Sequence, residues 1–337
     1  MRTFFARFAI SVGALVVPVT AACHRQSSES GPTGSSSATA DGAPAASGDG
    51  AASAAASSKP ASFPVPKASV DLVLDPEGFP PYEGATGSVE GTIRVQGPPA
   101  PSVAVNTSQC PAALDTYGKL FREGTPDTPN GPRALADAVV VVIGYTGFYL
   151  PDRNDAVKVT ITPSCAYPTR TIAITYGQRL DISNQSKLLF APALDDSMTT
   201  AVMVAPPQEK GDPVRLYPDK AGYFKLIDRM EPYVREDLYV FRHSLHAVTD
   251  RAGHYRIDGV PVGTLKVGVH HPTVDADAEA PVDVVAGVVQ KVDLTLTFKP
   301  KPKAQVGDAG APMSTRCLRW VDPATKLKCA EYDRPND

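Results

Sequence analysis

Hydrophobic and polar residues alternate over short stretches in the middle of this chain. The clearest example is AVTDRAGHYRIDGVPVG, from Ala247 to Gly263. A period of two is typical of a strand with one buried face, so we expect Tyr255 and Ile257 on one face and the residues between them on the other. Because Gly253 can adopt positive φ, Thr249 to Gly253 is predicted to form a hairpin turn.

Similar patterns occur on both sides of this segment. Gly87 to Gln96 alternates and is predicted to be a strand, as are the late segments Val282 to Val285 and Gln290 to Phe298. Leu135 to Gly144 is continuously apolar, which predicts a strand buried on both faces. Val70 to Leu74 also alternates, and we expect an edge strand there.

The region between the two halves of this pattern has its own strand signals. Further predicted strands are Val157–Ile161, Thr171–Tyr176, Arg179–Asn184, Leu188–Leu194, Thr200–Ala205, Gly222–Ile227 and Asp237–Phe241. The chain has 33 prolines and 26 glycines, which favour turns over long helices, and no window has an apolar stripe at helical spacing over four turns. The predicted fold class is therefore all-β, a sandwich or a barrel.

Composition, net charge and the absence of common catalytic motifs exclude several classes of function. The 337 residues suffice for two domains and tails, and a net charge of −3 gives no sign of nucleic-acid binding. The sequence contains no Gly-x-Ser-x-Gly, no His-Glu-x-x-His, no phosphate loop and no dinucleotide fingerprint. We therefore predict that the protein is not an enzyme.

The N-terminal segment has the features of a secretion signal. Met1 to Ala22 combines early arginines, a short apolar run and small residues before Cys23, which predicts a signal peptide. Cys23 then resembles the lipidated first residue of a bacterial lipoprotein, although ordinary signal cleavage with a free Cys23 remains the alternative. Residues 23–68 are predicted to be the lipid anchor and a disordered Ser/Ala/Gly tether.

The Thr-Asp-x-x-Gly-x-Tyr-x-Ile-x-x-Val-Pro-x-Gly pattern from Thr249 to Gly263 resembles the carboxypeptidase regulatory-like domain. That resemblance implies a small, generally non-catalytic, prealbumin-like β-sandwich that shares its fold with carbohydrate-binding modules. In the family the hairpin soon follows the apolar strand, whereas about 100 residues intervene here. We therefore predict one sandwich from residues 85–148 plus 242–298, interrupted by a second domain at 149–241.

The interrupting segment resembles a cupredoxin-like domain. The matching pieces are Cys165-Ala-Tyr-Pro, Ile172-Ala-Ile-Thr-Tyr-Gly-Gln178, Leu180-Asp-Ile-Ser-Asn184, Gly222-Tyr-Phe and Tyr239-Val-Phe-Arg-His243. The resemblance implies copper ligands at the places of Phe190, Asp228, Glu231 and Val234. None of these residues is a histidine, a cysteine or a methionine, so we expect the copper site to be lost and predict no cofactor.

The histidines leave a second interpretation open. A mononuclear copper or zinc site could use His243, His246 and His271, but irregular histidine pairs are weak motifs, and a structural role is favoured. Members of the resembled family usually have histidines at the places of His243 and His271 in addition to their copper ligands, which also fits a structural role.

Four cysteines remain after Cys23, and they allow three disulfide pairings. An oxidising compartment favours disulfides, and Cys110–Cys165 with Cys317–Cys329 is the natural choice. The second pair would staple a small tail within residues 299–337, which otherwise begins as a Pro/Gly-rich linker.

Two functional hypotheses follow from these features. The first is a non-enzymatic lipoprotein of the bacterial cell envelope, anchored in the periplasm or at the outer membrane, that binds a glycan or an envelope protein. The alternative is a cupredoxin-like protein that handles copper or transfers electrons through the remaining histidines.

Overall fold

The computed structural model describes residues 65–150, 156–195, 202–274 and 276–300. The signal peptide, Cys23, most of the tether and the Cys317–Cys329 pair lie outside the described residues. Within the described part, no helix is long and apolar enough to cross a membrane.

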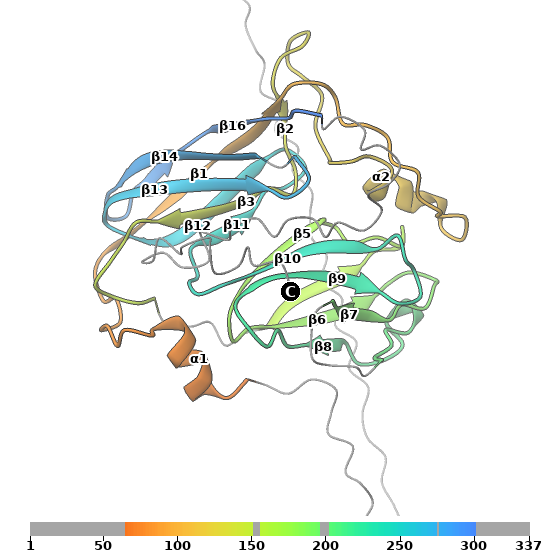
Figure 1. The fold of residues 1–337 in the computed structure, drawn as a ribbon, viewed down its shortest axis with the longest axis horizontal. Helices are drawn as coiled ribbons and strands as arrows, with labels where there is room; N and C mark the ends of the chain where they lie inside the picture. Colours follow the sequence, from red (N-terminus) through yellow and green to blue (C-terminus); the bar gives the residue numbers. More distant parts are fainter. Residues whose placement is uncertain (1–64, 151–155, 196–201, 275, 301–337) are drawn as a thin grey trace, which may run out of the picture. The chain divides into compact units, whose positions relative to one another are not determined.

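The described residues form sixteen strands and a few short helices, so the predicted all-β fold class is confirmed (Figure 1). The helical segments are α1 (Lys67–Leu74), η1 (Pro111–Ala113), α2 (Leu114–Tyr117) and η2 (Pro207–Glu209). The strands are β1 (Thr86–Gln96), β2 (Arg133–Ala134), β3 (Val139–Ile143), β4 (Ala156–Ile161), β5 (Thr171–Thr175), β6 (Arg179–Asn184), β7 (Pro192–Leu194), β8 (Val214–Leu216), β9 (Gly222–Asp228), β10 (Arg235–Phe241), β11 (His246–Val248), β12 (His254–Pro261), β13 (Gly263–His271), β14 (Ala276–Val284), β15 (Val289–Lys291) and β16 (Leu294–Thr297).

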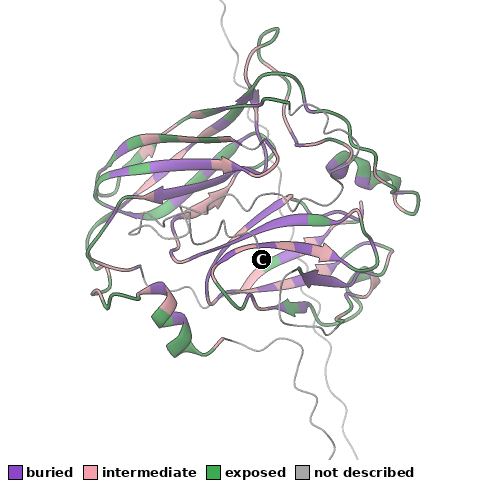
Figure 2. Cartoon of the chain, in the orientation of Figure 1, coloured by how far each residue is buried: buried purple, intermediate pink, exposed green. Residues whose placement is uncertain are grey.

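Strands from both ends of the described chain build a first sandwich. In one sheet, β1 pairs antiparallel with β12 and β2 and parallel with β15 and β16. The other sheet has the order β11-β3-β13-β14. Every second residue of β1 is buried, among them Val89, Ile93 and Val95, and these pack with Val140 and Val142 of β3 in one core. Figure 2 shows buried and exposed segments along the strands of this sandwich. The alternating apolar residues of β1 therefore form the inner face of the sheet, and the polar residues between them form its outer face.

Strands β4 to β10 build a second sandwich and pair only with one another. Its sheets have the orders β5-β10-β9-β7 and β4-β6-β8, with parallel pairing of β4 with β6 and of β5 with β10. Phe190, Phe224 and Tyr167 are fully buried in its core. These pairings suit an interrupted first sandwich, while the domain boundaries near residues 148 and 242 remain a prediction.

The continuous apolar run of β3 serves two layers. Val140 and Val142 face the core of the first sandwich, whereas Val139 and Val141 pack against Tyr239 and Phe241 of β10. The expected burial of β3 on both faces is confirmed, because one face packs in the core of the first sandwich and the other packs against β10 of the second.

The predicted edge strand at Val70 to Leu74 is wrong, since these residues belong to α1. Val70 and Leu74 are four residues apart, a spacing that places both on one helical face, and both are buried. Val70 packs closely on Gly177, where an added Cβ would lie 2.7 Å from its Cγ1. A five-residue alternation is too short to distinguish the two periods.

The predicted hairpin at Thr249 to Gly253 is a turn between two sheets. Gly253 has a φ of +75°, as expected, and its N–H donates to Asp250 O at 3.0 Å. The flanking strands do not pair with each other, because β11 joins β3 and β12 joins β1. Thr249 explains the divergence: its Oγ1 accepts the Ala138 N–H at 2.9 Å and donates to Leu135 O at 2.7 Å.

A buried carboxylate links three segments beside β3. Asp137, 2% exposed, receives two hydrogen bonds from the guanidinium of Arg122, one from the Arg170 N–H at 2.8 Å and one from Thr169 Oγ1 at 2.9 Å. Its own N–H donates to Thr249 O at 3.1 Å. Burial by itself raises a carboxyl pKa, but the hydrogen bonds and charge of Arg122 outweigh it and hold the pKa of Asp137 below its usual value.

The predicted disulfide Cys110–Cys165 is confirmed, with its Cα atoms 6.2 Å apart. It joins the segment before η1 to the loop between β4 and β5, and Tyr233 Oη donates to Cys165 O at 3.2 Å beside it. Closing a loop of 55 residues is worth about 4 kcal/mol in the chain-entropy model.

Candidate functional site

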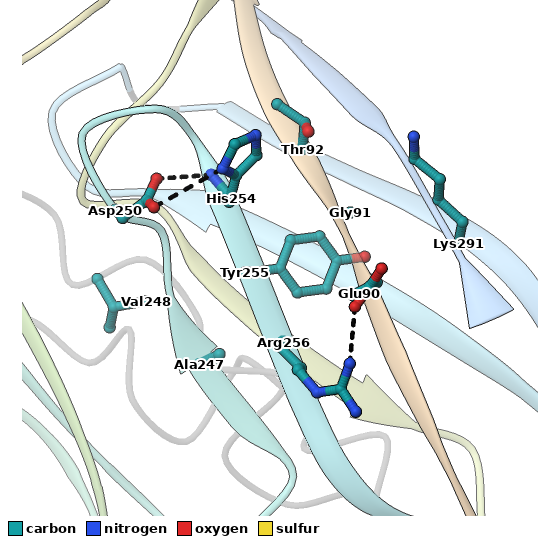
Figure 3. A pocket seen from close by; sticks show the side chains of 10 residues that line it. All are labelled: Glu90, Gly91, Thr92, Ala247, Val248, Asp250, His254, Tyr255, Arg256 and Lys291. Carbon is teal, nitrogen blue, oxygen red and sulfur yellow. Dashed lines mark hydrogen bonds and ion pairs between the residues drawn. The ribbon is translucent and has the colours of Figure 1, made fainter. Parts of the chain in front are cut away.

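A concave site of about 560 Å³ lies on the first sandwich, where β1 runs between β12 and β15, and it extends past β12 to β11 of the other sheet (Figure 3). It is lined by Glu90, Gly91, Thr92, Ala247, Val248, Asp250, His254, Tyr255, Arg256 and Lys291. The polar face that alternation predicted for β12, which includes Arg256, therefore contributes directly to the site.

Strand register gathers its charged groups. Glu90 lies directly across from Arg256 on one side and from Lys291 on the other. Arg256 Nη1 donates to Glu90 Oε2 at 2.8 Å, and Arg256 Nε donates to Asp258 Oδ1 at 3.0 Å (Figure 3). The charge of Asp258, followed by the hydrogen bond to Glu90, raises the pKa of Arg256, so the guanidinium remains charged. Lys291 Nζ lies 3.9 Å from Asp293 Oδ2.

The turn before β12 forms the rim of the site. Asp250 Oδ1 accepts the N–H groups of Ala252 and His254, each at 2.8 Å, which fixes the carboxylate within the turn. His254 Nδ1 lies 3.8 Å from Asp250 Oδ2. The Thr-Asp-x-x-Gly motif therefore positions an imidazole and a carboxylate at the edge of the concave surface.

The floor of the site is rigid. Tyr255 is buried, and its hydroxyl donates to Val292 O at 2.7 Å. A Cβ at Gly91 would lie 1.9 Å from the same carbonyl oxygen, so only glycine fits there. Burial raises the pKa of Tyr255, and its phenol stays neutral.

The lining combines donors and acceptors without a dominant charge. Two carboxylates, Glu90 and Asp250, stand among the cationic Arg256 and Lys291 and the imidazole of His254. All five side chains are at least partly exposed and can reach a bound molecule. Such a surface suits hydrogen bonding to several hydroxyl groups better than binding of a highly charged ligand.

The four places where the resemblance implied copper ligands lie together in the second sandwich. Phe190 and Val234 are fully buried apolar side chains of its core. Asp228 Oδ2 accepts the Ala191 N–H at 2.8 Å, and its Oδ1 accepts the N–H groups of Met230 and Glu231, each at 2.9 Å. The carboxylate therefore closes the loop through backbone hydrogen bonds.

This donor set does not fit copper. A blue-copper centre needs imidazole and thiolate ligands, whereas these positions offer two hydrocarbon side chains and two carboxyl groups. Burial raises the pKa of Asp228 despite its three backbone hydrogen bonds, and burial and Asp228 raise that of Glu231. Met230, the neighbouring thioether, is exposed.

Two histidines of the alternative metal site, His243 and His246, lie close together, with 6.4 Å between their ring centroids, whereas His271 lies apart from them. His243 Nδ1 accepts the Leu245 N–H at 3.3 Å, and His246 stacks on Phe241 with 4.9 Å between ring centroids. His271 lies elsewhere, against Phe121, and accepts two backbone N–H groups at its Nδ1. In the described ranges, no three His, Cys, Asp or Glu side chains are grouped so that they could hold a metal ion.

Sequence reasoning missed the contributions of Glu90 and Lys291 to the concave site. Alternation in GSVEGTIRVQ places Glu90 on the polar face of its strand, so a signal was present. The pairing of β1 with both β12 and β15 joins residues about 165 and 200 positions apart, and no local pattern encodes it.

No family model matches this chain, and no curated protein matches it. Similar solved structures include a mutant of amicyanin in its reduced state, 16% identical over 25% of this chain and 81% of that chain, with a TM-score of 0.22. A purple cupredoxin from Nitrosopumilus maritimus is 16% identical over 25% of this chain and 98% of that chain, with a TM-score of 0.21. A copper-containing nitrite reductase from Thermus scotoductus SA-01 is 16% identical over 29% of this chain and 25% of that chain, with a TM-score of 0.22.

These TM-scores are too low to support a conclusion about this chain. Its architecture of two β-sandwiches rests on the strand pairings and on the two separate cores. A fold of this kind also hosts many functions, so the function must be argued from the site.

Proposed function

We propose that this chain is a non-enzymatic binding protein of the bacterial cell envelope whose first sandwich binds a neutral, polyhydroxylated ligand, a glycan. The observation that supports this most is the concave polar site between β12, β1 and β15, with its rigid floor and exposed charged rim. Its donors and acceptors balance, which favours an uncharged ligand rich in hydroxyl groups.

The cell-envelope part of the proposal depends on the N-terminal sequence. Cys23 follows small residues that end an apolar run, and the Ser/Ala/Gly tether behind it would give the sandwiches reach from a membrane. We propose that Cys23 carries lipid. Substitution of Cys23 by alanine should then move the protein from the membrane fraction to the soluble fraction, and unchanged retention would contradict the anchor.

Substitution of Arg256 by alanine is expected to weaken glycan binding at least about tenfold, because a hydrogen bond to a charged group contributes roughly 1.5–3 kcal/mol. A glycan array would identify the ligand, and isothermal titration would then compare the affinities. Glu90→Gln should also weaken binding, because it removes the carboxylate that orients Arg256.

Arg251→Ala is the matched control. Arg251 is an exposed arginine on the neighbouring turn that pairs with Asp115 and does not line the site. It should leave the affinity unchanged. Equal affinities of the native and Arg256→Ala chains would show that the glycan binds elsewhere, and an array without any hit would argue against a glycan.

Copper handling through His243, His246 and His271 is the less favoured alternative. His243 and His246 lie near each other, but His271 packs on Phe121, and no third His, Cys, Asp or Glu of the described residues completes a ligand group with them. Copper retained by the purified chain after dialysis against a chelator would favour the alternative.

A further inference from the structure

Three loops of the second sandwich lie side by side at one end of its strands. They span residues 185–191, 202–210 and 228–234. Phe190 and Ala205 exchange backbone hydrogen bonds in both directions, at 3.3 and 2.8 Å, and Arg229 N–H donates to Ala191 O at 3.0 Å. Backbone bonds thus join the three loops into one surface.

This surface exposes large aliphatic side chains. Phe190 and Ala205 point into the core, so their neighbours Leu189 and Val204 project to the opposite side. The side chains that form this surface, called the loop patch below, are Leu189 (40% exposed), Val202 (60%), Val204 (44%) and Met230 (53%). A cluster of exposed apolar residues of this kind marks an interaction site.

Exposed cationic residues lie on the same three loops as the loop patch. Lys187, Lys210 and Arg229 are exposed, and none of them forms an ion pair in the described part of the chain. Glu209 is the exposed acid on these loops, and it accepts a hydrogen bond from Gln185 Nε2 at 3.1 Å. The exposed charge around the patch is therefore positive.

We propose that the loop patch docks onto an anionic lipid bilayer, with its aliphatic tips in the headgroup region and its cations on lipid phosphates. Aliphatic residues flanked by lysine and arginine match the layered polarity of such a surface. This contact is separate from the glycan site and does not require lipid on Cys23.

The test uses the chain from Cys23 onward, made without lipid as the Cys23→Ser variant, so that only the folded surface can bind. We expect it to sediment with vesicles that contain phosphatidylglycerol, to bind pure phosphatidylcholine vesicles less well, and to dissociate as salt is raised. The double variant L189Q/M230Q should bind the anionic vesicles at least about tenfold more weakly. V285Q/V288Q, which changes two exposed valines of the first sandwich, is the matched control and should bind like the parent chain.

Absence of binding to anionic vesicles would overturn the proposal, and so would equal binding by L189Q/M230Q. A photo-crosslinking residue in place of Met230, used in envelope membranes, provides a second readout. Lipid adducts would support the proposal, whereas adducts with a protein alone would show that the loop patch is a protein-docking surface.

Discussion

Substitution of Asp137 by alanine is expected to lower the free energy of unfolding by about 3–5 kcal/mol, the usual cost of breaking a buried ion pair. Asp137 holds Arg122 on one side and the adjacent residues Thr169 and Arg170 on the other, so it joins two separate segments beside β3. Without the carboxylate, the buried guanidinium of Arg122 keeps one hydrogen bond, to Pro168 O at 3.1 Å, and loses its counter-charge. Urea denaturation at pH 7 measures the change.

Two further variants separate the causes. Asp137 has a φ of +64°, which asparagine tolerates better than alanine, so Asp137→Asn should cost less than Asp137→Ala. The exposed Asp127, 3.9 Å from Arg94, is the control, and Asp127→Ala should change stability by less than about 0.5 kcal/mol. A small loss for Asp137→Ala, similar to that of the control, would show that the buried network is not a major source of stability.

The strands of the first sandwich were predictable because local patterns determine them. In β12, Tyr255 and Ile257 are buried while Arg256 and Asp258 are exposed, as the period of two predicts. The continuous apolar run of β3 correctly indicated two buried faces, although only the structure shows that β10 covers the second one.

The sheet that each strand joins was not predictable from those patterns. The turn after β11 was predicted to be a hairpin, yet it connects two different sheets. The turn at Gly177, between the predicted strands Thr171–Tyr176 and Arg179–Asn184, also connects two different sheets. A short turn with a glycine fixes a change of direction, while distant partners such as β1 and β3 decide the pairing.

The candidate site was only partly predictable for the same reason. Side-chain types at Phe190 and Val234 were enough to predict that copper ligands were absent there. The concave site depends on Glu90 lying between Arg256 and Lys291, which requires the register of three strands. Asp137 also binds Arg122, Thr169 and Arg170, and no sequence motif predicts that these residues lie close together.

A second buried carboxyl group, Glu236, is expected to make stability fall as pH rises. Its Oε1 accepts the hydroxyl of Tyr117 at 2.5 Å, and its Oε2 has no hydrogen-bond partner in the described structure. Burial raises the pKa of Glu236 to about 8, from an ordinary value of 4.5, despite the hydrogen bond from Tyr117. The folded chain therefore keeps a proton that the unfolded chain releases above pH 4.5. Because of this difference in bound protons, the free energy of unfolding falls as pH rises from 4.5 to 8.

His271 has the opposite effect at lower pH. Burial lowers its pKa from 6.5 to about 4, so its contribution is present above pH 6.5 and is lost as pH falls toward 4. Between pH 4.5 and 6.5 the folded chain holds one proton on Glu236 and the unfolded chain holds one on His271, so the two effects cancel. From pH 6.5 to 8, Glu236 still differs in protonation between the folded and unfolded chains while His271 no longer does, and the contribution of Glu236 lowers stability by about 2 kcal/mol, at about 1.4 kcal/mol per pH unit.

Glu236→Gln is therefore expected to change the shape of the pH profile as well as its height. The amide oxygen can still accept the Tyr117 hydroxyl, but the side chain no longer titrates. The stability of the variant relative to the native chain should therefore rise by about 2 kcal/mol from pH 5 to 6.5 and by about another 2 kcal/mol from pH 6.5 to 8. Urea denaturation at pH 5, 6.5 and 8 measures the difference in stability between the two chains. The contributions of Asp228, Glu231 and other groups that both chains share cancel in this difference.

The exposed Glu83→Gln is the control and should follow the native profile. Parallel profiles for the native and Glu236→Gln chains would show that Glu236 is ionised in the folded protein.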